Sequence, residues 1–217
     1  MDISKISQGT INGNIENAKK YMNEQDIADC NIGLGYVDKN EDGKTSAIEM
    51  YKNWSDTCAS IFSGNEAFAA RGEEIATQVG ELYTRYAGKD GVLDAYEYNA
   101  GLQSDEMGVL LEQYWEMKNI VDAQNGEEVK GLGRYDSNYD GKTTSVDVYK
   151  SKSDLYEQVF AGNEKSKVKA EEIAQKQAEI LSKFAGDDGV LSSEEFAEAV
   201  DSLEYKKTVR EYMDLDM

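Results

Sequence analysis

The chain has 217 residues, enough for one large domain or two small ones, and 43 acidic against 23 basic residues give it a formal net charge of −20. This charge argues against nucleic acid as a partner, because its phosphates would be repelled. No apolar run approaches the roughly 18–20 residues that a membrane-spanning helix needs, and histidine, the commonest general base, is absent, so we expect neither a membrane span nor an enzyme.

Apolar residues recur with helical spacing along most of the chain, which predicts an all-α protein. The first helix is marked by Ile11, Ile15, Ala18 and Met22. Further helices are expected over 48–62, 75–86, 107–121, 173–184 and 205–212, with Ile48 and Phe62 on the buried face of the first of these. Gly-Asn pairs at 64–65 and 162–163 are expected to end the helices before them.

The chain contains an internal repeat. Residues 33–119 align without gaps on residues 131–217, about 98 residues further on, and about 32 of the 87 aligned pairs are identical. The identities concentrate in segments rich in carboxylate and amide side chains, which indicates metal binding. The predicted organisation is an N-terminal helix over 1–28, a first lobe over 29–122 and a second lobe over 123–217, with a polar linker at 122–128.

Both cysteines, Cys30 and Cys58, belong to the first copy, and the second copy has Glu128 and Tyr156 at the aligned positions. A duplicated disulfide would have been kept in both copies, so we expect free thiols in a reducing compartment. The first residues do not combine a basic start with an apolar stretch, so no secretory signal is predicted and a cytoplasmic location is expected.

The segment 38–49 places oxygen-bearing side chains at alternate positions. A hard cation such as Ca²⁺ takes about six to eight oxygen ligands at short range, so a tightly curled segment must supply them. Glycine at the sixth position, Gly43, permits the sharp turn. The candidate ligands are Asp38, Asn40, Asp42, the carbonyl of Lys44, Ser46 and Glu49.

The segment 136–147 repeats this pattern, with the candidate ligands Asp136, Asn138, Asp140, the carbonyl of Lys142, Thr144 and Asp147. Asp147 is one methylene shorter than Glu49, so it is expected to weaken calcium binding or to shift the preference towards Mg²⁺. Both segments resemble the twelve-residue loop of the EF-hand, with a likeness to dockerin loops, and the resemblance implies calcium binding. The alternative is a loop held by hydrogen bonds alone.

The segments 87–97 and 185–195 keep the second half of such a loop but lack the acidic residues at its start. They resemble the shortened eleven-residue loop that opens penta-EF-hand proteins such as the calpains, in which an alanine carbonyl replaces the first carboxylate. Carried over position by position, the resemblance implies as ligands Ala87 (carbonyl), Asp90, Val92 (carbonyl), Glu97, Ala185 (carbonyl), Asp188, Val190 (carbonyl) and Glu195. The chain would then bind up to four calcium ions; otherwise the short segments only brace their twelve-residue partners.

EF-hand loops work in pairs, so we expect 38–49 to pair with 87–97, and 136–147 with 185–195. Short backbone bridges are predicted between Leu93 and Thr45 and between Leu191 and Thr143. The expected fold is therefore two tandem EF-hand pairs. Each is preceded by a helix that its glycines, at 33 and 35 or at 131 and 133, are expected to shorten or break, because each glycine costs about 1 kcal/mol.

These features predict a calcium-binding protein that acts as a sensor or a buffer, with a protein or peptide as a candidate calcium-dependent partner. The alternative is a structural or scaffold protein whose lobes are folded and stiffened by bound metal. A sensor is expected to expose an apolar groove on binding calcium. Core packing explains equally well the methionines placed to line such a groove, Met50, Met107, Met117 and Met213.

Overall fold

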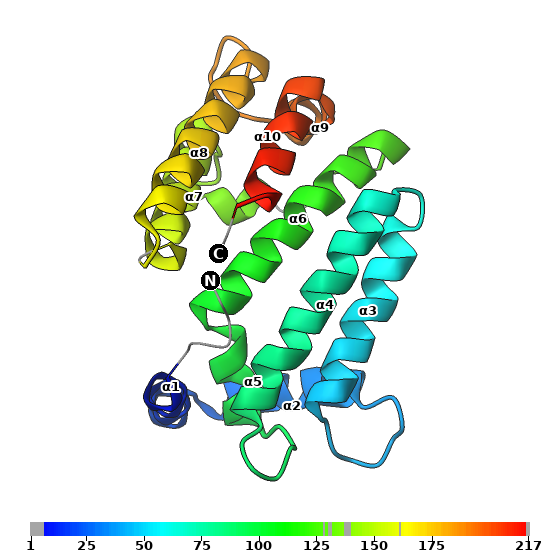
Figure 1. The fold of residues 1–217 in the computed structure, drawn as a ribbon. Helices are drawn as coiled ribbons and strands as arrows, with labels where there is room; N and C mark the ends of the chain where they lie inside the picture. Colours follow the sequence, from blue (N-terminus) through cyan, green and yellow to red (C-terminus); the bar gives the residue numbers. More distant parts are fainter. Residues whose placement is uncertain (1–6, 128, 130–131, 137–139, 161, 216–217) are drawn as a thin grey trace. The chain divides into compact units, whose positions relative to one another are not determined.

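The computed structural model describes residues 7–127, 129, 132–136, 140–160 and 162–215 (Figure 1). These residues form an all-helical protein, which confirms the predicted fold class at that level. The chain divides into two compact units, the first ending at Leu111 and the second beginning at Glu112, within the helix Asp105–Asn125 (α6). None of the described helices is both long enough and apolar enough to cross a membrane.

The first unit contains α1 (Gln8–Tyr21), α2 (Glu24–Val37), α3 (Ala47–Phe62), α4 (Glu66–Tyr86), α5 (Ala95–Leu102) and the start of α6. The helices α3 and α4 form an antiparallel hairpin (Figure 1). Asn65 accepts a hydrogen bond from the amide of Phe68 at 3.2 Å and so caps α4. The predicted helix stop at 64–65 is confirmed, and the face formed by Ile75, Val79 and Leu82 is fully buried.

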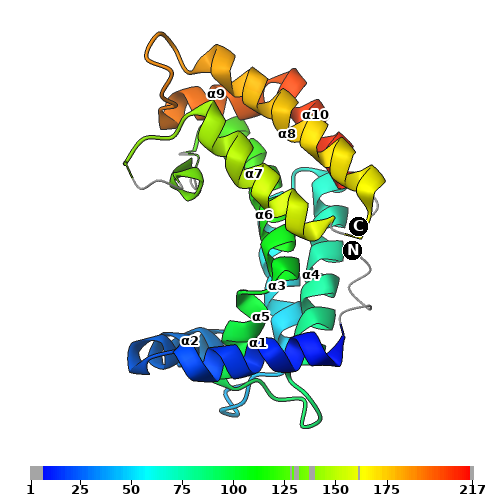
Figure 2. The same cartoon turned by 90° about the vertical axis from the view of Figure 1, so that its left-hand side faces the viewer.

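The second unit contains the rest of α6, the 3₁₀ helix η2 (Leu132–Tyr135), α7 (Ser145–Val159), α8 (Glu164–Phe184), α9 (Ser193–Asp201) and α10 (Leu203–Met213). The helices α7 and α8 lie side by side and repeat the hairpin of the first unit (Figure 2). The apolar faces of α8 and α10 meet, and the predicted face of α10 is buried at Tyr205, Val209 and Tyr212.

Two predictions about helix positions are wrong. Ile48 is 75% exposed, because α3 begins at Ala47 and its inward positions in the first turn belong to Ala47 and Met50. A shift of one residue turns a side chain by about 100° around the helix axis, which carries Ile48 to the outside. The polar stretch expected as a linker at 122–128 is helical up to Asn125, since α6 extends that far.

A glutamate links the two helices of each hairpin. In the first unit, the hydroxyls of Tyr51 and Ser55 on α3 each donate a hydrogen bond of 2.6 Å to the carboxylate of Glu73 on α4. These bonds, that of Ser55 first, lower the pKa of Glu73. The second unit repeats the link with Tyr149, Ser153 and Glu171, at 3.4 and 2.7 Å.

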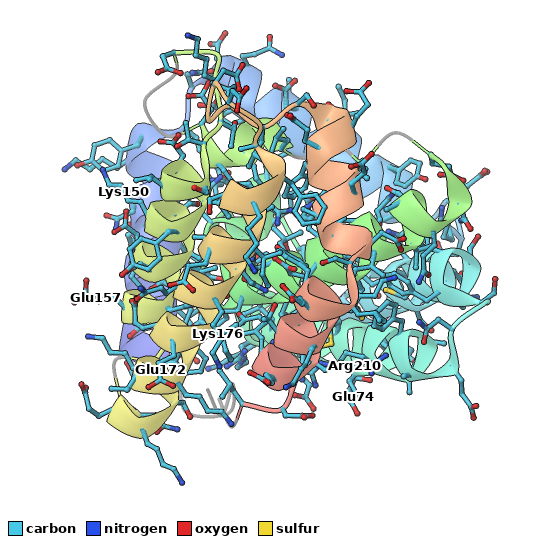
Figure 3. All side chains as sticks on the ribbon, turned by 90° about the horizontal axis from the view of Figure 1, so that it is seen from above. Glu74, Lys150, Glu157, Glu172, Lys176 and Arg210 are labelled. Carbon is cyan, nitrogen blue, oxygen red and sulfur yellow. The ribbon has the colours of Figure 1, made fainter. Side chains whose placement is uncertain are left out.

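The outer faces of the α7–α8 hairpin carry exposed charges. Lys150 and Glu157 project from α7, and Glu172 and Lys176 lie on the exposed surface of α8 (Figure 3). Such side chains are solvated, which agrees with the high charge of the chain. Lys152 lies two residues from Lys150 on the same helix but is only 1% exposed.

Both cysteines are buried free thiols, as expected from the sequence. Burial raises the pKa of the Cys58 thiol to about 11, and the nearby Glu73 adds to the effect. Burial also raises the pKa of Cys30. A thiol with a raised pKa is a poor nucleophile, so both side chains act here as small apolar residues of the first unit's core.

Close approach of α3 and α4 depends on Gly72. A Cβ atom added to Gly72 would lie 2.7 Å from Cys58 Cβ and 3.1 Å from Phe62 Cδ2, whereas one added to Gly13 in α1 would meet nothing within 4 Å. We therefore expect Gly72→Ala to destabilise the protein by about 1–3 kcal/mol through overpacking. Gly13→Ala should stabilise it by up to about 1 kcal/mol, because alanine is the better helix former.

Urea unfolding followed by circular dichroism measures both changes. If Gly72→Ala stabilises the protein as much as Gly13→Ala does, the α3–α4 contact is not as tight as described.

Candidate metal-binding segments

Hydrogen bonds to its own amides curl the segment 38–49. The Asp38 carboxylate accepts from the amides of Asp42 at 3.3 Å and Gly43 at 2.9 Å, and Asn40 Oδ1 accepts from the amide of Asp42 at 2.9 Å. Asp42 Oδ1 in turn accepts from the amide of Lys44 at 2.9 Å. Gly43 has φ +78°, a value that side chains with a Cβ rarely adopt. The side chains of the first three candidate ligands therefore all accept hydrogen bonds from amides of one tight turn.

The segment ends at a capping box that opens α3. Glu49 Oε2 accepts from the amide of Ser46 at 2.9 Å and from its hydroxyl at 3.0 Å, and Ser46 Oγ accepts from the amide of Glu49. The other carboxylate oxygen of Glu49, Oε1, is buried and has no hydrogen-bond partner. Sequence reasoning placed both residues among the ligands but did not anticipate that they also cap the helix.

The segment 136–147 has the same local geometry where it is described. The Asp136 carboxylate accepts from the amides of Asp140 at 3.2 Å and Gly141 at 2.9 Å, and Gly141 has φ +79°. Asp147 Oδ2 accepts from the amide and hydroxyl of Thr144 at 2.9 and 2.7 Å, which caps α7. Asp140 Oδ1 accepts from the amide of Lys142 at 2.8 Å. The candidate ligand Asn138 lies outside the described residues.

Two glycines with positive φ form the turn in each eleven-residue segment. Gly88 and Gly91 have φ +61° and +72°, and Gly186 and Gly189 have φ +61° and +71°. The last carboxylate reaches back to the start of its segment, since a Cβ atom on Gly88 would lie 3.8 Å from Glu97 Oε1. The equivalent distance between Gly186 and Glu195 Oε1 is 3.1 Å. Both ends of each short segment are therefore close together.

The other candidate ligands of the short segments lie in or next to these turns. Asp90 Oδ1 accepts from the amide of Val92 at 3.3 Å, and Asp188 Oδ1 accepts from that of Val190 at 3.0 Å. Two of the four proposed carbonyl donors, Ala87 and Ala185, are buried C-cap residues of α4 and α8.

Negative charge accumulates in the first short segment. Burial raises the pKa of Glu97, and the charges of Asp94 and Asp90 raise it further, against the hydrogen bond from the Asp94 amide and the charge of Lys19. The carboxylates of this segment therefore repel one another, and a bound cation would relieve that repulsion.

Backbone hydrogen bonds join the two segments of each unit at the predicted positions. The amide of Leu93 donates to the carbonyl of Thr45 at 2.8 Å, and the amide of Leu191 donates to the carbonyl of Thr143, also at 2.8 Å. Each contact forms a single antiparallel bridge, Ser46 with Val92 and Thr144 with Val190. One antiparallel backbone bridge thus joins the twelve-residue segment to the eleven-residue segment in each unit.

The glycines before the twelve-residue segments do not act as expected in the first unit. The helix α2 passes through Gly33 and Gly35 without a break, so this prediction is wrong there. A Cβ atom on Gly33 would lie 3.2 Å from the Tyr98 hydroxyl oxygen, so the glycine allows the ring of Tyr98 on α5 to approach α2. In the second unit Gly131 lies outside the described residues, and the described helix directly before Asp136 is η2.

No three acidic or cysteine side chains in the described part of the chain gather into a group that could hold a metal ion. Each expected twelve-residue ligand set contains three carboxylates, and in the described part of the chain these do not gather into such a group. The carboxylates of 38–49 instead accept hydrogen bonds from loop amides, which keeps like charges apart.

Sequence reasoning missed a buried ionic cluster in the second unit. Lys152 on α7 pairs with Glu112 at 3.2 Å and with Glu116, both on α6, and its Nζ also donates to Gln177 Oε1 at 2.8 Å. Arg134 of η2 pairs with Glu112 at 3.1 Å. Burial by itself raises the pKa of Glu112, but Arg134 and Lys152 outweigh it and lower the pKa to about 2.

A signal for this cluster is present in the sequence. Lys152 follows Val148 by four residues and precedes Tyr156 by four, so it stands on the apolar face of α7. Glu112 and Glu116 have the same spacing on α6. A lysine in an apolar stripe requires a buried counter-charge, and the two glutamates supply it.

No protein-family model, curated protein or solved structure matches the chain. The resemblance to EF-hand loops therefore depends on the residues themselves. The features that carry it are the spacing of the donors, the positive φ of Gly43 and Gly141, and the backbone bridge within each unit.

The helix cap of Ser46 can be tested without metal. In excess chelator, Ser46→Ala should lower the free energy of unfolding by about 1 kcal/mol, because the amide of Glu49 at the start of α3 loses its capping acceptor. Ser60→Ala, at an exposed position of the same helix, should change it by less than about 0.5 kcal/mol. Equal effects of the two substitutions in urea unfolding would contradict the capping role.

Proposed function

We propose that the chain binds calcium through paired segments of the EF-hand type, one pair in each unit. In 38–49 the ion would be held by Asp38, Asn40, Asp42, the carbonyl of Lys44, Ser46 and Glu49. In 136–147 the equivalent set ends in Asp147. All of these donors are hard oxygen atoms, the kind that Ca²⁺ and Mg²⁺ prefer, and the described residues offer no histidine or gathered thiols to attract a softer metal.

The buried Oε1 of Glu49 supports this proposal most strongly. A buried carboxylate oxygen without a hydrogen-bond partner is unfavourable, since the atom has lost its water and gained nothing in return. A cation bound by the segment 38–49 would supply the missing interaction with Glu49 Oε1. The other oxygen of Glu49 is already occupied by Ser46, so capping and metal binding would use different atoms.

The eleven-residue segments are proposed as weaker sites. Each offers only two carboxylates, Asp90 and Glu97 or Asp188 and Glu195. Calcium affinity decreases when fewer of the ligands are charged. Asp187 stands where the first copy has Lys89, so the second short segment should bind more tightly than the first. The proposed capacity is up to four ions, with Mg²⁺ a competitor at 136–147.

A structural role for the metal is the second candidate function, and the methionines favour it over sensing. Met50, Met107 and Met117 are 3%, 1% and 0% exposed, so they belong to the core rather than to an open groove. Calcium would then serve to hold the bridged segments together and stiffen each unit. A sensor would have to open these cores on binding, with a protein or peptide as its partner.

Native mass spectrometry during a calcium titration tests the binding proposal. We expect two ions to bind first, at the twelve-residue segments, and two more at higher concentration. A final count of two would restrict binding to the longer segments. A chain that binds no calcium, and whose melting temperature does not change with excess chelator, would contradict the proposal.

Glu49→Gln separates metal binding from capping. Glutamine keeps a carbonyl oxygen that can accept from Ser46 but loses the negative charge, so stability in chelator should stay within about 0.5 kcal/mol of the unsubstituted chain. Calcium affinity at 38–49 should fall by about tenfold or more, because ligand charge sets the affinity of such loops.

The matched control is Glu41→Gln, which makes the same charge change at an exposed residue of the same segment that is not a proposed ligand. Calorimetric titration measures both variants. Equal losses of affinity in Glu49→Gln and Glu41→Gln would mean that the segment attracts calcium only through its overall charge.

A further inference from the structure

The two units enter their twelve-residue segments differently. In the first unit, α2 is a helix of 14 residues that begins with a capping box at Asn23. In the second unit the described element before Asp136 is η2, a 3₁₀ helix of four residues. A helix of that length cannot hold itself together in water, so other contacts must fix it.

Those contacts come from the last two residues of η2. Arg134 pairs through Nη2 with Glu112 Oε2 at 3.1 Å, and the Tyr135 hydroxyl donates to Glu112 Oε1 at 3.2 Å. The ring of Tyr135 also packs edge-on against Phe196 of α9, with 6.3 Å between ring centroids. Asp136, the first candidate ligand, follows directly, so its backbone is anchored to α6 through Glu112.

The far end of the segment is anchored to the same carboxylate. Thr144 and Asp147 open α7, and Lys152 lies little more than one turn further along that helix. Its Nζ contacts Glu112 Oε1 at 3.2 Å and also pairs with Glu116, which accepts from the Tyr205 hydroxyl of α10 at 3.3 Å. Both ends of the segment 136–147 are therefore tied to Glu112.

Among its described residues, the first unit buries no charged side chain. The positions aligned with Arg134 and Lys152 hold the uncharged residues Tyr36 and Trp54. Tyr36 is 72% exposed, so it does not anchor the end of α2 to the core as Arg134 anchors η2. The charged cluster thus occurs in the unit whose entering helix is short.

We infer that Glu112, Arg134 and Lys152 are positioning residues that set the metal affinity of the segment 136–147. This inference rests on the proposed calcium binding. The cluster fixes the backbone on either side of the ligands, as the supporting groups around metal sites do. Calcium affinity in the second unit should therefore depend on residues of α6, whereas affinity in the first unit should not.

The test uses the full chain and a balanced pair of substitutions, Glu112→Gln with Arg134→Met. The double variant removes one negative and one positive group and leaves Lys152 paired with Glu116, so no buried charge loses all its partners. Calcium is titrated while the amide NMR signals of Gly43 and Gly141 are followed, because each reports one twelve-residue segment. Circular dichroism in saturating calcium reports folding.

We expect the affinity reported by Gly141 to fall by roughly 10- to 100-fold, the usual effect of removing groups that support a metal site. The affinity reported by Gly43 and the helicity in saturating calcium should stay unchanged. Arg134→Lys, which keeps the charge, should lose less affinity than the double variant. Tyr36→Met, the aligned change in the first unit, should affect neither segment.

An unchanged affinity at Gly141 in a folded double variant, or equal losses at Gly43 and Gly141, would overturn the inference. If the double variant does not fold, Arg134→Lys decides: a folded protein with wild-type affinity overturns the inference, and a selective loss at Gly141 supports it. A chain without substitutions that binds calcium at Gly43 but not at Gly141 contradicts only this inference. One that binds at neither contradicts the proposed function as well.

Discussion

One backbone hydrogen bond in each unit fixes the relation between its two candidate segments. Thr45 and Leu93 form it in the first unit, and Thr143 and Leu191 form it in the second. The net contribution of such a bond to stability is only about 1 kcal/mol, but leaving its buried groups unpaired would cost more. All four residues are at most 5% exposed, so these backbone groups cannot form hydrogen bonds with water instead. The register of the two segments in each unit follows from this pairing.

The same two threonines extend the constraint to the preceding helical elements. The hydroxyl of Thr45 donates to the carbonyl of Leu34 in α2 at 2.9 Å, and that of Thr143 donates to the carbonyl of Leu132 in η2 at 3.4 Å. Each threonine therefore holds the turn before its segment as well as the neighbouring segment. Beyond this shared frame the units differ, because the first holds its entering helix through helix length and capping, whereas the second uses a buried ionic cluster.

The choice of charges over apolar packing has an energetic consequence. A buried ion pair seldom stabilises a protein more than well-packed apolar residues would, whereas removing one partner is strongly destabilising. Glu112, Glu116 and Lys152 are each less than 9% exposed, so the cluster contributes mainly a specific geometry. That geometry is what a short 3₁₀ helix lacks by itself. The two units thus support similar segments by different physical means.

The parts of the fold and of the candidate segments that could be predicted are those set by the spacing of nearby residues in the sequence. The buried faces of α4 and α10 follow from spacing, because apolar side chains at helical intervals have only the core to occupy. The curl at 38–49 follows from its glycine and its alternating oxygen donors. The exposure of Ile48 depends on the residue at which α3 begins, and the intact α2 depends on Tyr98, a neighbour distant in sequence. Glu112 and Glu116 were missed because two of 43 acidic residues look like surface charges until the fold buries them.

Hydrogen bonding within the segment 38–49 is compatible with the proposed metal binding. An ionised carboxylate offers two oxygens with about four acceptor positions. Asp38 uses each of its oxygens once, for Asp42 and for Gly43, and Glu49 uses only Oε2. Acceptor capacity therefore remains on the oxygens that a cation would need. Since the amide bonds already curl the backbone, a cation would have little chain left to order, and less conformational entropy would oppose its binding.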